Sequence, residues 1–260
     1  MAHSEKQKRI LQRLGYYDYQ NGLIYRHLNQ EGGWNHHLEN CRNFIIKAAG
    51  LIKPEKVTVL GSGWLLDVPL KELSEICRSV DLIDIVHPPD AYSQVAKLGN
   101  VTLTELDITG GLAWETWEKT SGFPFRKKLK STDDIIVPDV TLPGDPGMVI
   151  SLNLLSQLDT LPLRRVKEKS DLPGEQYTRF RQRVQKKHLE LLNCYPSVLI
   201  TDTSEIFTDK KGNRSEIGSI AINLPYGEMR EEWTWDFDLV RSDYYGMNSV
   251  LKVVAMIVRR

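Results

Sequence analysis

The sequence predicts an α/β domain in which parallel strands alternate with helices. Three observations lead to this prediction. From Val57 onward, short apolar runs of strand length are separated by turn residues and amphipathic segments, which is the pattern of right-handed β-α-β units. A Gly-Ser-Gly turn or an aspartate follows each of the first three runs. Late in the chain, three strand-like segments follow one another without a long helix, which indicates antiparallel additions to the sheet edge.

Five apolar runs fit the parallel strands, at residues 57–60, 80–86, 101–106, 148–153 and 197–203. The segment after the first run places its apolar residues on one helical face, with Asp67 as the expected N-cap. Further helices are predicted at residues 90–98, 112–119 and 174–193. The late strands are predicted at residues 217–224, 232–240 and 250–258, and residues 242–248 form the turn between the last two.

The first fifty residues precede this alternation and have a helical pattern. Apolar residues from Trp34 to Ala48 recur with a 3.6-residue period between Gly33 and Gly50, and residues 21–29 fit a shorter helix. We therefore expect a helical cap at residues 1–52 and an α/β domain at residues 53–260. A proline-containing stretch at about 122–147 is expected to be an insertion in that domain.

The composition argues against several classes of partner. Basic and acidic residues number 34 each, so the molecule has no net charge and no long-range field that would attract nucleic acid. The N-terminal residues lack the apolar run of a signal peptide, and no apolar stretch is long enough to span a membrane. We expect a cytoplasmic protein with no membrane or nucleic-acid partner. Cys41, Cys77 and Cys194 are widely spaced and are expected to be reduced thiols.

Residues suited to ligand binding follow the first three predicted strands. Ligands of open α/β sheets bind at the carboxyl ends of the strands, near the point where the strand order reverses. Gly61 and Gly63 follow the first strand and allow the backbone to approach a ligand closely. Asp84 ends the second strand, where a carboxylate can accept hydrogen bonds from ribose hydroxyls, and Asp107 follows the third strand in the same register. Together these residues predict a nucleoside-binding site.

From Val57 to Arg260 the sequence resembles the class I S-adenosylmethionine-dependent methyltransferases. The resemblance is carried by VTVLGSG, VDLIDIVHP, LTELDIT and VISLNLLSQL at the first four strands, and by EEWTWDFDLV and SVLKVVAMIV at the last two. It implies a Rossmann-like, mostly parallel sheet of about seven strands. The terminal hairpin of that sheet is antiparallel, and its final strand inserts into the sheet. A helical cap precedes it.

The resemblance also implies S-adenosylmethionine as cofactor, a small-molecule methyl acceptor and a set of binding residues. Gly61 and Gly63 would lie against the methionine part, Asp84 would hold the ribose, and Asp107 the adenine amino group. Asn153 would lie at the mouth of the pocket. The expected cofactor-binding residues, with their neighbours in the chain, are Gly61, Ser62, Gly63, Asp84, Ile85, Asp107, Ile108 and Asn153.

The glycine loop departs from the family pattern at two positions. Val59 stands where the superfamily usually has an acidic residue, and Leu65 where it often has a third glycine. Two other hypotheses therefore stay open. One is a non-catalytic binding or interaction protein with a degenerate methyltransferase fold, in which Trp64 or Leu65 fills the pocket. The other is a nicotinamide-dependent oxidoreductase, which requires a sixth parallel strand and a glycine where this chain has Leu66.

No general base follows the fourth strand. The segment from Asn153 to Gln157 also lacks the Asn-Pro-Pro-aromatic signature of enzymes that methylate amino groups of nucleic acids. Methyl transfer from a sulfonium depends more on in-line approach and desolvation than on a strong acid or base. The catalytic residues are therefore not predicted, and His37, Asn153 and Gln157 are the candidates near the mouth.

Several other residues have a structural interpretation. His37 shares a helix face with Trp34 and Cys41, which is typical of a packed histidine. Adjacent His36 and His37 do not share a face, so no metal site is predicted. His87 fits a ligand-facing or a structural role equally well. The basic stretch 164–187 is expected to be a solvated surface, and Trp233 and Trp235 are expected to be packing residues. The sequence predicts neither the acceptor nor the oligomeric state.

Overall fold

A computed structural model describes residues 3–122, 129–241 and 246–258. Its centre is an eight-stranded sheet with the order β3-β2-β1-β4-β5-β8-β7, and β6 pairs with β5 off this path. The strands are β1 (Lys56–Leu60), β2 (Ser79–Asp84), β3 (Val101–Glu105), β4 (Met148–Leu152), β5 (Ser197–Thr208), β6 (Arg214–Gly218), β7 (Gly227–Asp238) and β8 (Asn248–Val258). The helices are α1 (Glu5–Leu14), α2 (Tyr16–Asn29), α3 (Asn35–Ile52), α4 (Leu70–Ile76), α5 (Pro89–Val95), α6 (Leu112–Thr120), α7 (Thr160–Lys169) and α8 (Gly174–Leu192), with a short 3₁₀ turn at Thr132–Asp134.

Strands β1 to β5 form the parallel part of the sheet, as predicted. Their sequences are nearly continuous apolar runs because helices cover both faces of the sheet. All five residues of β4 are buried, and so are the last four of β1. The chain order reverses between β1 and β4, so the carboxyl ends of these two strands flank the switch point of the sheet.

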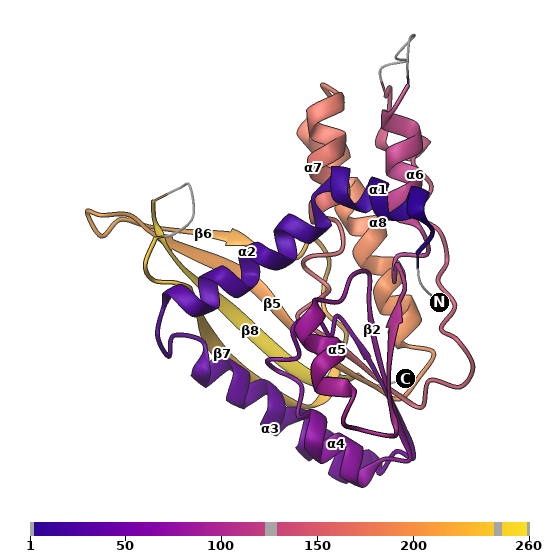
Figure 1. The fold of residues 1–260 in the computed structure, drawn as a ribbon. Coiled ribbons are helices and arrows are strands. Elements are labelled where there is room, and N and C mark those ends of the chain that lie inside the picture. Colours follow the sequence, from indigo (N-terminus) through magenta and orange to yellow (C-terminus); the bar gives the residue numbers. More distant parts are fainter. Residues whose placement is uncertain (1–2, 123–128, 242–245, 259–260) are drawn as a thin grey trace.

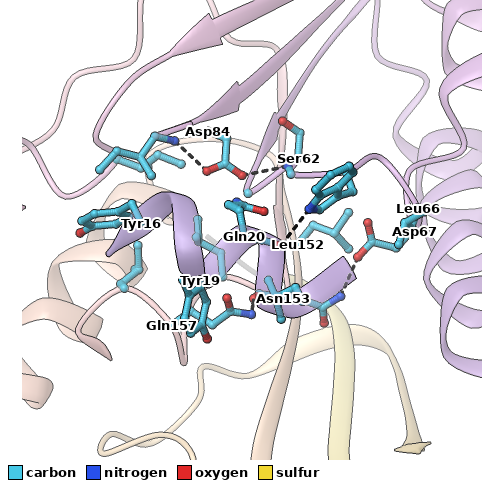
Figure 2. Close-up of a pocket in the computed structure, with 18 of the residues that line it drawn as sticks. Tyr16, Tyr19, Gln20, Ser62, Leu66, Asp67, Asp84, Leu152, Asn153 and Gln157 are labelled. Carbon is cyan, nitrogen blue, oxygen red and sulfur yellow. Dashed lines mark hydrogen bonds between the residues drawn. The ribbon is translucent and has the colours of Figure 1, made fainter. Parts of the chain in front are cut away.

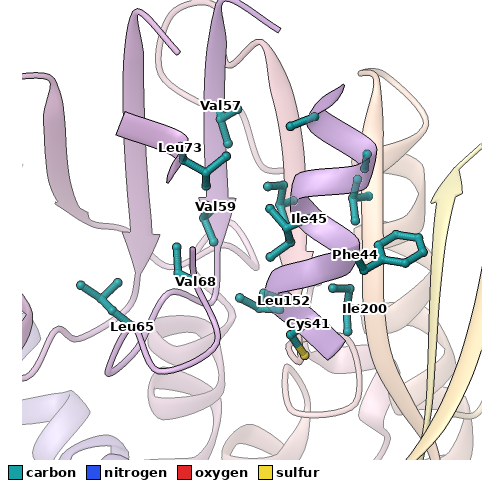
Figure 3. Close-up of a cluster of buried hydrophobic side chains, with 14 of the residues drawn as sticks. Cys41, Phe44, Ile45, Val57, Val59, Leu65, Val68, Leu73, Leu152 and Ile200 are labelled. Atoms are coloured by element: carbon teal, nitrogen blue, oxygen red, sulfur yellow. The ribbon is translucent and has the colours of Figure 1, made fainter. Parts of the chain in front are cut away.

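Helix α3 packs against one face of the sheet and supplies much of the larger core (Figure 3). Its apolar stripe matches the predicted period, with Cys41, Phe44 and Ile45 fully buried. These side chains meet β1, β4 and β5, together with the segment that runs from the glycine loop into α4. Burying each large apolar side chain contributes about 2–3 kcal/mol before the entropy cost, so α3 is an integral layer of the fold. Gly50 lies inside α3, where the sequence suggested its end.

Helix α8 packs on the opposite face through Leu191 and Leu192, which join a second apolar cluster with β4, β5 and β8. Beyond it, α6, α7 and α8 pack around Leu112, Val166 and Phe180. Helix α7 was not predicted, because its lysine and arginine residues are as conspicuous in the sequence as its apolar stripe.

The antiparallel additions predicted at the sheet edge are present. Strand β8 pairs antiparallel with both β5 and β7, so the last strand of the chain lies inside the sheet. Strand β6 pairs with β5 and every one of its residues is exposed. The sheet therefore has one strand more than the seven that the resemblance implies. Figure 1 shows β5 and β6 extending away from the parallel part of the sheet.

The N-terminal helices α1 and α2 run across the carboxyl end of the sheet (Figure 1). Helix α1 packs through Leu11 and Leu14 against Val86 and α6. At its end, Gly15 adopts a φ of 87° and the Leu14 carbonyl accepts a hydrogen bond of 2.8 Å from Arg164 of α7. The sequence indicated only the second half of α2. The division at residue 52 into a cap and an α/β domain stays a prediction.

Two sequence expectations are wrong and another falls partly on residues that are not described. The strand predicted at residues 217–224 is instead β6 at Arg214–Gly218, and residues 219–224 are not in a strand. Asp67 is not the N-cap of α4: the helix begins at Leu70 with Pro69 as its cap, and the Asp67 side chain bonds to Asn153 instead. Of the insertion at about 122–147, residues 123–128 lie outside the described part of the chain, as do residues 242–245 of the predicted terminal turn. Among the described helices, none has the length and apolarity to cross a membrane.

Candidate functional site

A cavity opens at the carboxyl ends of β1, β2 and β4, beside the switch point (Figure 2). Residues from many parts of the chain line it: helix α2, the start of α3, the ends of β2 and β4, the loops that follow β1 to β4, the start of α7, and β7. The structure brings all ten sequence-predicted site residues to this cavity: His37, Gly61, Ser62, Gly63, Asp84, Ile85, Asp107, Ile108, Asn153 and Gln157.

The glycine loop contains Gly61 and Gly63, and a side chain is excluded at these two positions for different reasons. Gly61 has a φ of 83°, and an added Cβ would lie 2.8 Å from the Leu152 carbonyl oxygen of β4. It is needed for the close approach of two strand ends. Gly63 has a φ of 44°, and its missing Cβ would point toward Gln20 and Asp84 at 3.7–3.8 Å. Glycine at this second position therefore keeps cavity space open.

The turn continues to Leu65, where the family often has its third glycine. Leu65 has a φ of 62°, in the left-handed region that glycine adopts most easily. Its side chain is only 5% exposed and belongs to the core cluster against β1. The burial of this leucine offsets the strain of about 1–2 kcal/mol that a left-handed conformation costs a residue with a Cβ. The loop thus adopts a left-handed conformation at Leu65, although the position has no glycine.

Asp84 is held at the end of β2 by backbone N–H groups. Gly63 N–H donates to its Oδ2 at 2.8 Å, and Ile85 N–H donates to its Oδ1 at 2.7 Å. Burial raises the pKa of Asp84 to about 6, against these backbone bonds, which lower it. The carboxylate therefore lies fixed beside the glycine loop, with its remaining acceptor capacity toward the cavity.

Asp107 lies two residues beyond β3 and caps the start of α6. Its Oδ1 accepts the Thr109 N–H at 3.0 Å, and its Oδ2 accepts the Ala113 N–H at 3.2 Å. Burial raises its pKa above the usual value. Asp107 thus has a structural role at the N-terminus of α6 and also borders the cavity beside Ile108.

Asn153 and Asp67 form a bonded pair on another side of the cavity (Figure 2). The amide Nδ2 of Asn153 donates to Asp67 Oδ2 at 2.8 Å, and the Asn153 backbone has a φ of 49° directly after β4. Gln157 holds this turn by donating to the Asn153 carbonyl at 2.6 Å. Burial raises the pKa of Asp67 to about 6. No sequence pattern indicated this pair, because Asp67 precedes Asn153 by 86 residues.

His37 is a neutral, packed histidine that also borders the cavity. Its ring stacks on Trp235 at 3.8 Å between centroids, and burial lowers its pKa to about 3. Trp233 Nε1 lies 3.0 Å from His37 Nδ1. The Asn153 amide Nδ2 lies 3.0 Å from His37 Nε2, so both ring nitrogens face an N–H group, and a neutral imidazole accepts from one of them.

The Asn153 amide also bears on metal binding. His37, Cys41 and Asp67 place one ligand atom each within 4.8 Å of one another. The Asn153 Nδ2 lies 2.8 Å from Asp67 Oδ2, 3.0 Å from His37 Nε2 and 3.8 Å from Cys41 Sγ, so the amide nitrogen occupies the space between these ligand atoms. The position of this amide therefore disfavours a metal ion at this cluster.

The helix α2 residues on the cavity were not predicted as site residues. They are Tyr16, Tyr19, Gln20, Leu23 and Ile24, one face of a helix at the spacing i, i+3, i+4, i+7, i+8. This spacing was the available sequence signal, and the prediction missed it by starting the helix at residue 21. Trp235, expected only to pack, also lines the cavity. Burial raises the pKa of Tyr19 to about 12, so its hydroxyl is neutral.

Other predicted residues lie away from the cavity. His87 is beside Ser62, with 2.9 Å between Nε2 and Oγ, and burial lowers its pKa to about 4. His36 is exposed and lies 3.1 Å from the Asn40 amide. In the basic stretch, Arg181 pairs with buried Asp159 at 2.9 Å, so part of that stretch is structural and not only a solvated surface.

The non-catalytic hypothesis required Trp64 or Leu65 to fill the pocket. Neither does so. Leu65 points into the core, and Trp64 lines the cavity with its Nε1 donating to the Gln20 carbonyl at 3.0 Å. The oxidoreductase hypothesis required a sixth parallel strand, but β8 runs antiparallel to β5. That expectation is wrong for this chain.

The strand order decides the fold. The resemblance implied a mostly parallel sheet with a final strand that inserts antiparallel before its hairpin partner, and the structure has both. It adds the order β3-β2-β1-β4-β5 for the parallel strands. The chain has the class I methyltransferase fold. This methyltransferase fold carries two additions of its own, the exposed strand β6 and the N-terminal helices.

Comparison with solved structures finds methyltransferases at low similarity. The 1,6-didemethyltoxoflavin-N1-methyltransferase of Burkholderia thailandensis, solved with 1,6-didemethyltoxoflavin and S-adenosylhomocysteine, is 10% identical with a TM-score of 0.42 over 99% of this chain and 92% of its own. DhpI in complex with SAH is 12% identical with a TM-score of 0.39 over 96% and 98%. The methyltransferase domain of a bacterial CtHen1 is 7% identical with a TM-score of 0.33 over 84% and 99%.

No protein-family model and no curated protein matches the sequence. Because the TM-scores of the three structures are below 0.5, the assignment of the methyltransferase fold rests on the strand order of this chain.

Proposed function

We propose that this protein is an S-adenosylmethionine-dependent methyltransferase that acts on a small molecule. One observation carries the proposal: the glycine loop, Asp84, Asp107 and Asn153 follow four different strands, and all of them line one cavity at the switch point. This is the position at which open α/β sheets bind nucleotide-like ligands.

The residues present fit the cofactor. Gly63 keeps open the space between Gln20 and Asp84, which a Cβ would occupy. The buried Oε1 of Gln20 has no hydrogen-bond partner among the described residues, so this acceptor is available to a ligand. Asp84 would hold the ribose hydroxyls and Ile85 would lie against the ring system. Asp107 and Ile108 would border the adenine, with Gly61 and Ser62 near the methionine part.

The charge of the cavity supports the same cofactor. Among the described residues, three aspartates line the cavity and no lysine or arginine does. When bound, S-adenosylmethionine supplies a methyl group activated by a cationic sulfur, and an acidic, aromatic-rich cavity is favourable for such a cation. The chain's own contribution is to bind, to orient the acceptor and to exclude water.

Isothermal titration of the purified full chain with S-adenosylmethionine and S-adenosylhomocysteine tests the proposal. We expect saturable binding of both, with a 1:1 stoichiometry. Absence of binding of either ligand at millimolar concentration, in protein whose fold is verified by circular dichroism, would falsify the cofactor assignment. Asp90→Asn, an exposed carboxylate on α5 outside the cavity, is the matched control and should bind as the wild type does.

A further inference from the structure

The side of the cavity around Asp67 contains buried polar atoms that have no partner. Asn153 is 7% exposed and Trp235 is 5% exposed, and both line the cavity. The Oδ1 of Asn153 and the Nε1 of Trp235 make no hydrogen bond among the described residues. A buried polar atom without a partner costs about 1–3 kcal/mol, so a native site that contains two of them is arranged for a polar ligand.

The chemistry of this ligand follows from the orientation of the Asn153 amide. An ionised Asp67 needs a hydrogen-bond donor, and Asn153 Nδ2 lies 2.8 Å from its Oδ2. With the amide nitrogen in this position, Oδ1 is the unpartnered atom. The ligand thus meets two acceptors, the Asp67 carboxylate and the Asn153 carbonyl oxygen. A group with more than one hydrogen to donate satisfies both, and the unpartnered Trp235 Nε1–H, which can only donate, needs an acceptor elsewhere on the ligand.

The surroundings add a preference for positive charge. No lysine or arginine lines the cavity in the described part of the chain, and His37 is neutral because burial lowers its pKa to about 3. Trp34 and Trp235 present their rings, which meet edge to face at 4.8 Å between centroids. Carboxylates beside aromatic rings favour an ammonium group and disfavour a carboxylate or a phosphate.

The nearest cation acts from outside the cavity. Arg42 of α3 donates to the Leu66 carbonyl at 2.6 Å and lowers the pKa of Asp67, although desolvation has the larger, raising effect. Arg42 does not line the cavity, so it does not compete for the ligand position. The Asp67 carboxylate is therefore ionised above about pH 6 and available to a cation inside the cavity.

We propose that the methyl acceptor is a small molecule with an amine nitrogen, bound by Asp67 and Asn153 against the Trp34 and Trp235 rings. This inference rests on the proposed function. The ammonium form binds first and gives one proton to the Asp67 carboxylate. The nitrogen lone pair then forms the new N–CH₃ bond while the S–CH₃ bond breaks and its electron pair stays on sulfur. The products are the N-methylated ammonium ion, the neutral thioether and protonated Asp67, which releases its proton to water.

The test uses matched triplets of fragments on the same scaffolds: benzylamine, benzyl alcohol and benzoate, then tryptamine, tryptophol and indole-3-acetate. Each is titrated by ligand-observed NMR at pH 7.5 into the full chain, with and without S-adenosylhomocysteine. We expect at least one amine to bind roughly tenfold more tightly than its alcohol, since a charge-assisted hydrogen bond is worth about 1.5–3 kcal/mol. The carboxylates should bind most weakly.

Three proteins are compared: the wild type, Asp67→Asn and the exposed control Asp90→Asn. Asparagine keeps the shape of Asp67 and can still accept from Asn153, so the fold should be retained, with circular dichroism as the check. We expect Asp67→Asn to lose about tenfold in amine affinity and to bind S-adenosylhomocysteine within about threefold of the wild type. Asp90→Asn should behave as the wild type in both titrations.

Other results overturn the inference. They are the absence of any Asp67-dependent amine binding, carboxylates that bind as well as amines, and an Asp67→Asn variant that loses S-adenosylhomocysteine affinity while keeping amine affinity. The last result would assign Asp67 to the cofactor's own ammonium group. If the wild type binds no S-adenosylhomocysteine, the proposed function fails, whereas the amine titration of the free protein still tests the Asp67 site separately.

Discussion

Asp84 and Asp67 line the same cavity and both have a pKa raised to about 6 by burial, but they are held in different ways. Backbone N–H groups of Gly63 and Ile85 hold Asp84, whereas the side chain of Asn153 holds Asp67 (Figure 2). A backbone-held carboxylate keeps its place whatever side chains surround it. A carboxylate held by another side chain depends on a contact between distant parts of the chain, and its environment changes with single substitutions.

The largest expected effect on ligand binding comes from replacing Asp84. We expect Asp84→Ala to weaken S-adenosylhomocysteine binding by about 100-fold, because the ribose loses a charged acceptor worth about 2–3 kcal/mol. Isothermal titration measures the change, and circular dichroism with thermal unfolding verifies the fold. If Asp84→Ala and Asp67→Asn weaken this binding equally, the two carboxylates do not serve different ligands.

Substitution of the two loop glycines should affect different properties, mainly protein stability at Gly61 and mainly ligand binding at Gly63. Gly61→Ala places a Cβ 2.8 Å from the Leu152 carbonyl and should reduce the free energy of unfolding by about 2 kcal/mol. Gly63→Ala meets its neighbours at 3.7 Å or more, so we expect a loss of about 1 kcal/mol in stability but at least tenfold in S-adenosylhomocysteine affinity. Urea unfolding and calorimetry on the same samples provide both numbers. Equal stability of the two variants would contradict the close approach at Gly61.

Proton linkage gives a third measurement. The folded pKa of Asp67 is about 6, against an ordinary aspartate pKa of 3.8, so the folded protein binds more protons than the unfolded chain between these values. Ionising Asp67 therefore costs stability as the pH rises from about 4.5 to about 7.5, by about 2 kcal/mol. Asp67→Asn removes this cost, and its stability relative to wild type should improve by that amount over the same interval.

The difference between variant and wild type is the quantity to measure, by urea unfolding at each pH. His37, His87 and His188 have lowered pKa values, so they reduce the stability of both proteins as the pH falls below about 6.5. The charged and titratable groups around Asp67 are His37, Cys41 and Arg42 from α3 and Asp84 from β2. A flat difference curve would show that Asp67 titrates at its ordinary pKa in the folded protein.

The smallest expected effect comes from Trp233→Phe. This change removes the donor to His37 Nδ1 and should cost about 1 kcal/mol of stability. S-adenosylhomocysteine binding should be unchanged, because Trp233 does not line the cavity. With the indole donor gone, the Asn153 amide at 3.0 Å from Nε2 is the remaining N–H neighbour of the ring, so we expect the proton on Nδ1, and ¹⁵N NMR of the histidine ring reports the tautomer. A proton on Nε2 in Trp233→Phe would contradict the orientation of the Asn153 amide.

The parallel strands and their end residues could be predicted because each depends on a local pattern. A buried strand is a short apolar run, and Gly61, Asp84 and Asn153 come directly at or after such runs. The sheet order then places them together. Asp67 could not be predicted as a site residue, because an aspartate two residues before a proline also fits a helix cap, and its partner Asn153 is distant in sequence.

Two other parts of the site were missed for different reasons. The left-handed conformation of Leu65 is visible only in the backbone, since the loop has the turn that a glycine usually marks. The cavity face of α2 has a signal in its helical spacing, but tyrosine and glutamine among its apolar residues make this stripe weaker than that of α3.

Helix α2 has 14 residues and none of them is buried, whereas α1 buries three and α3 buries seven. Tyr16 and Leu23 are partly buried against two core clusters, and the same apolar face of α2 also lines the cavity. A ligand in the cavity would supply the contacts that this face lacks, so binding free energy and the local stability of α2 are linked quantities. Amide hydrogen exchange in α2 should therefore slow in proportion to occupancy, while exchange in α3 stays the same. The free energy needed to order this one helix opposes binding, so the measured affinity is lower than the contacts with the ligand alone would give.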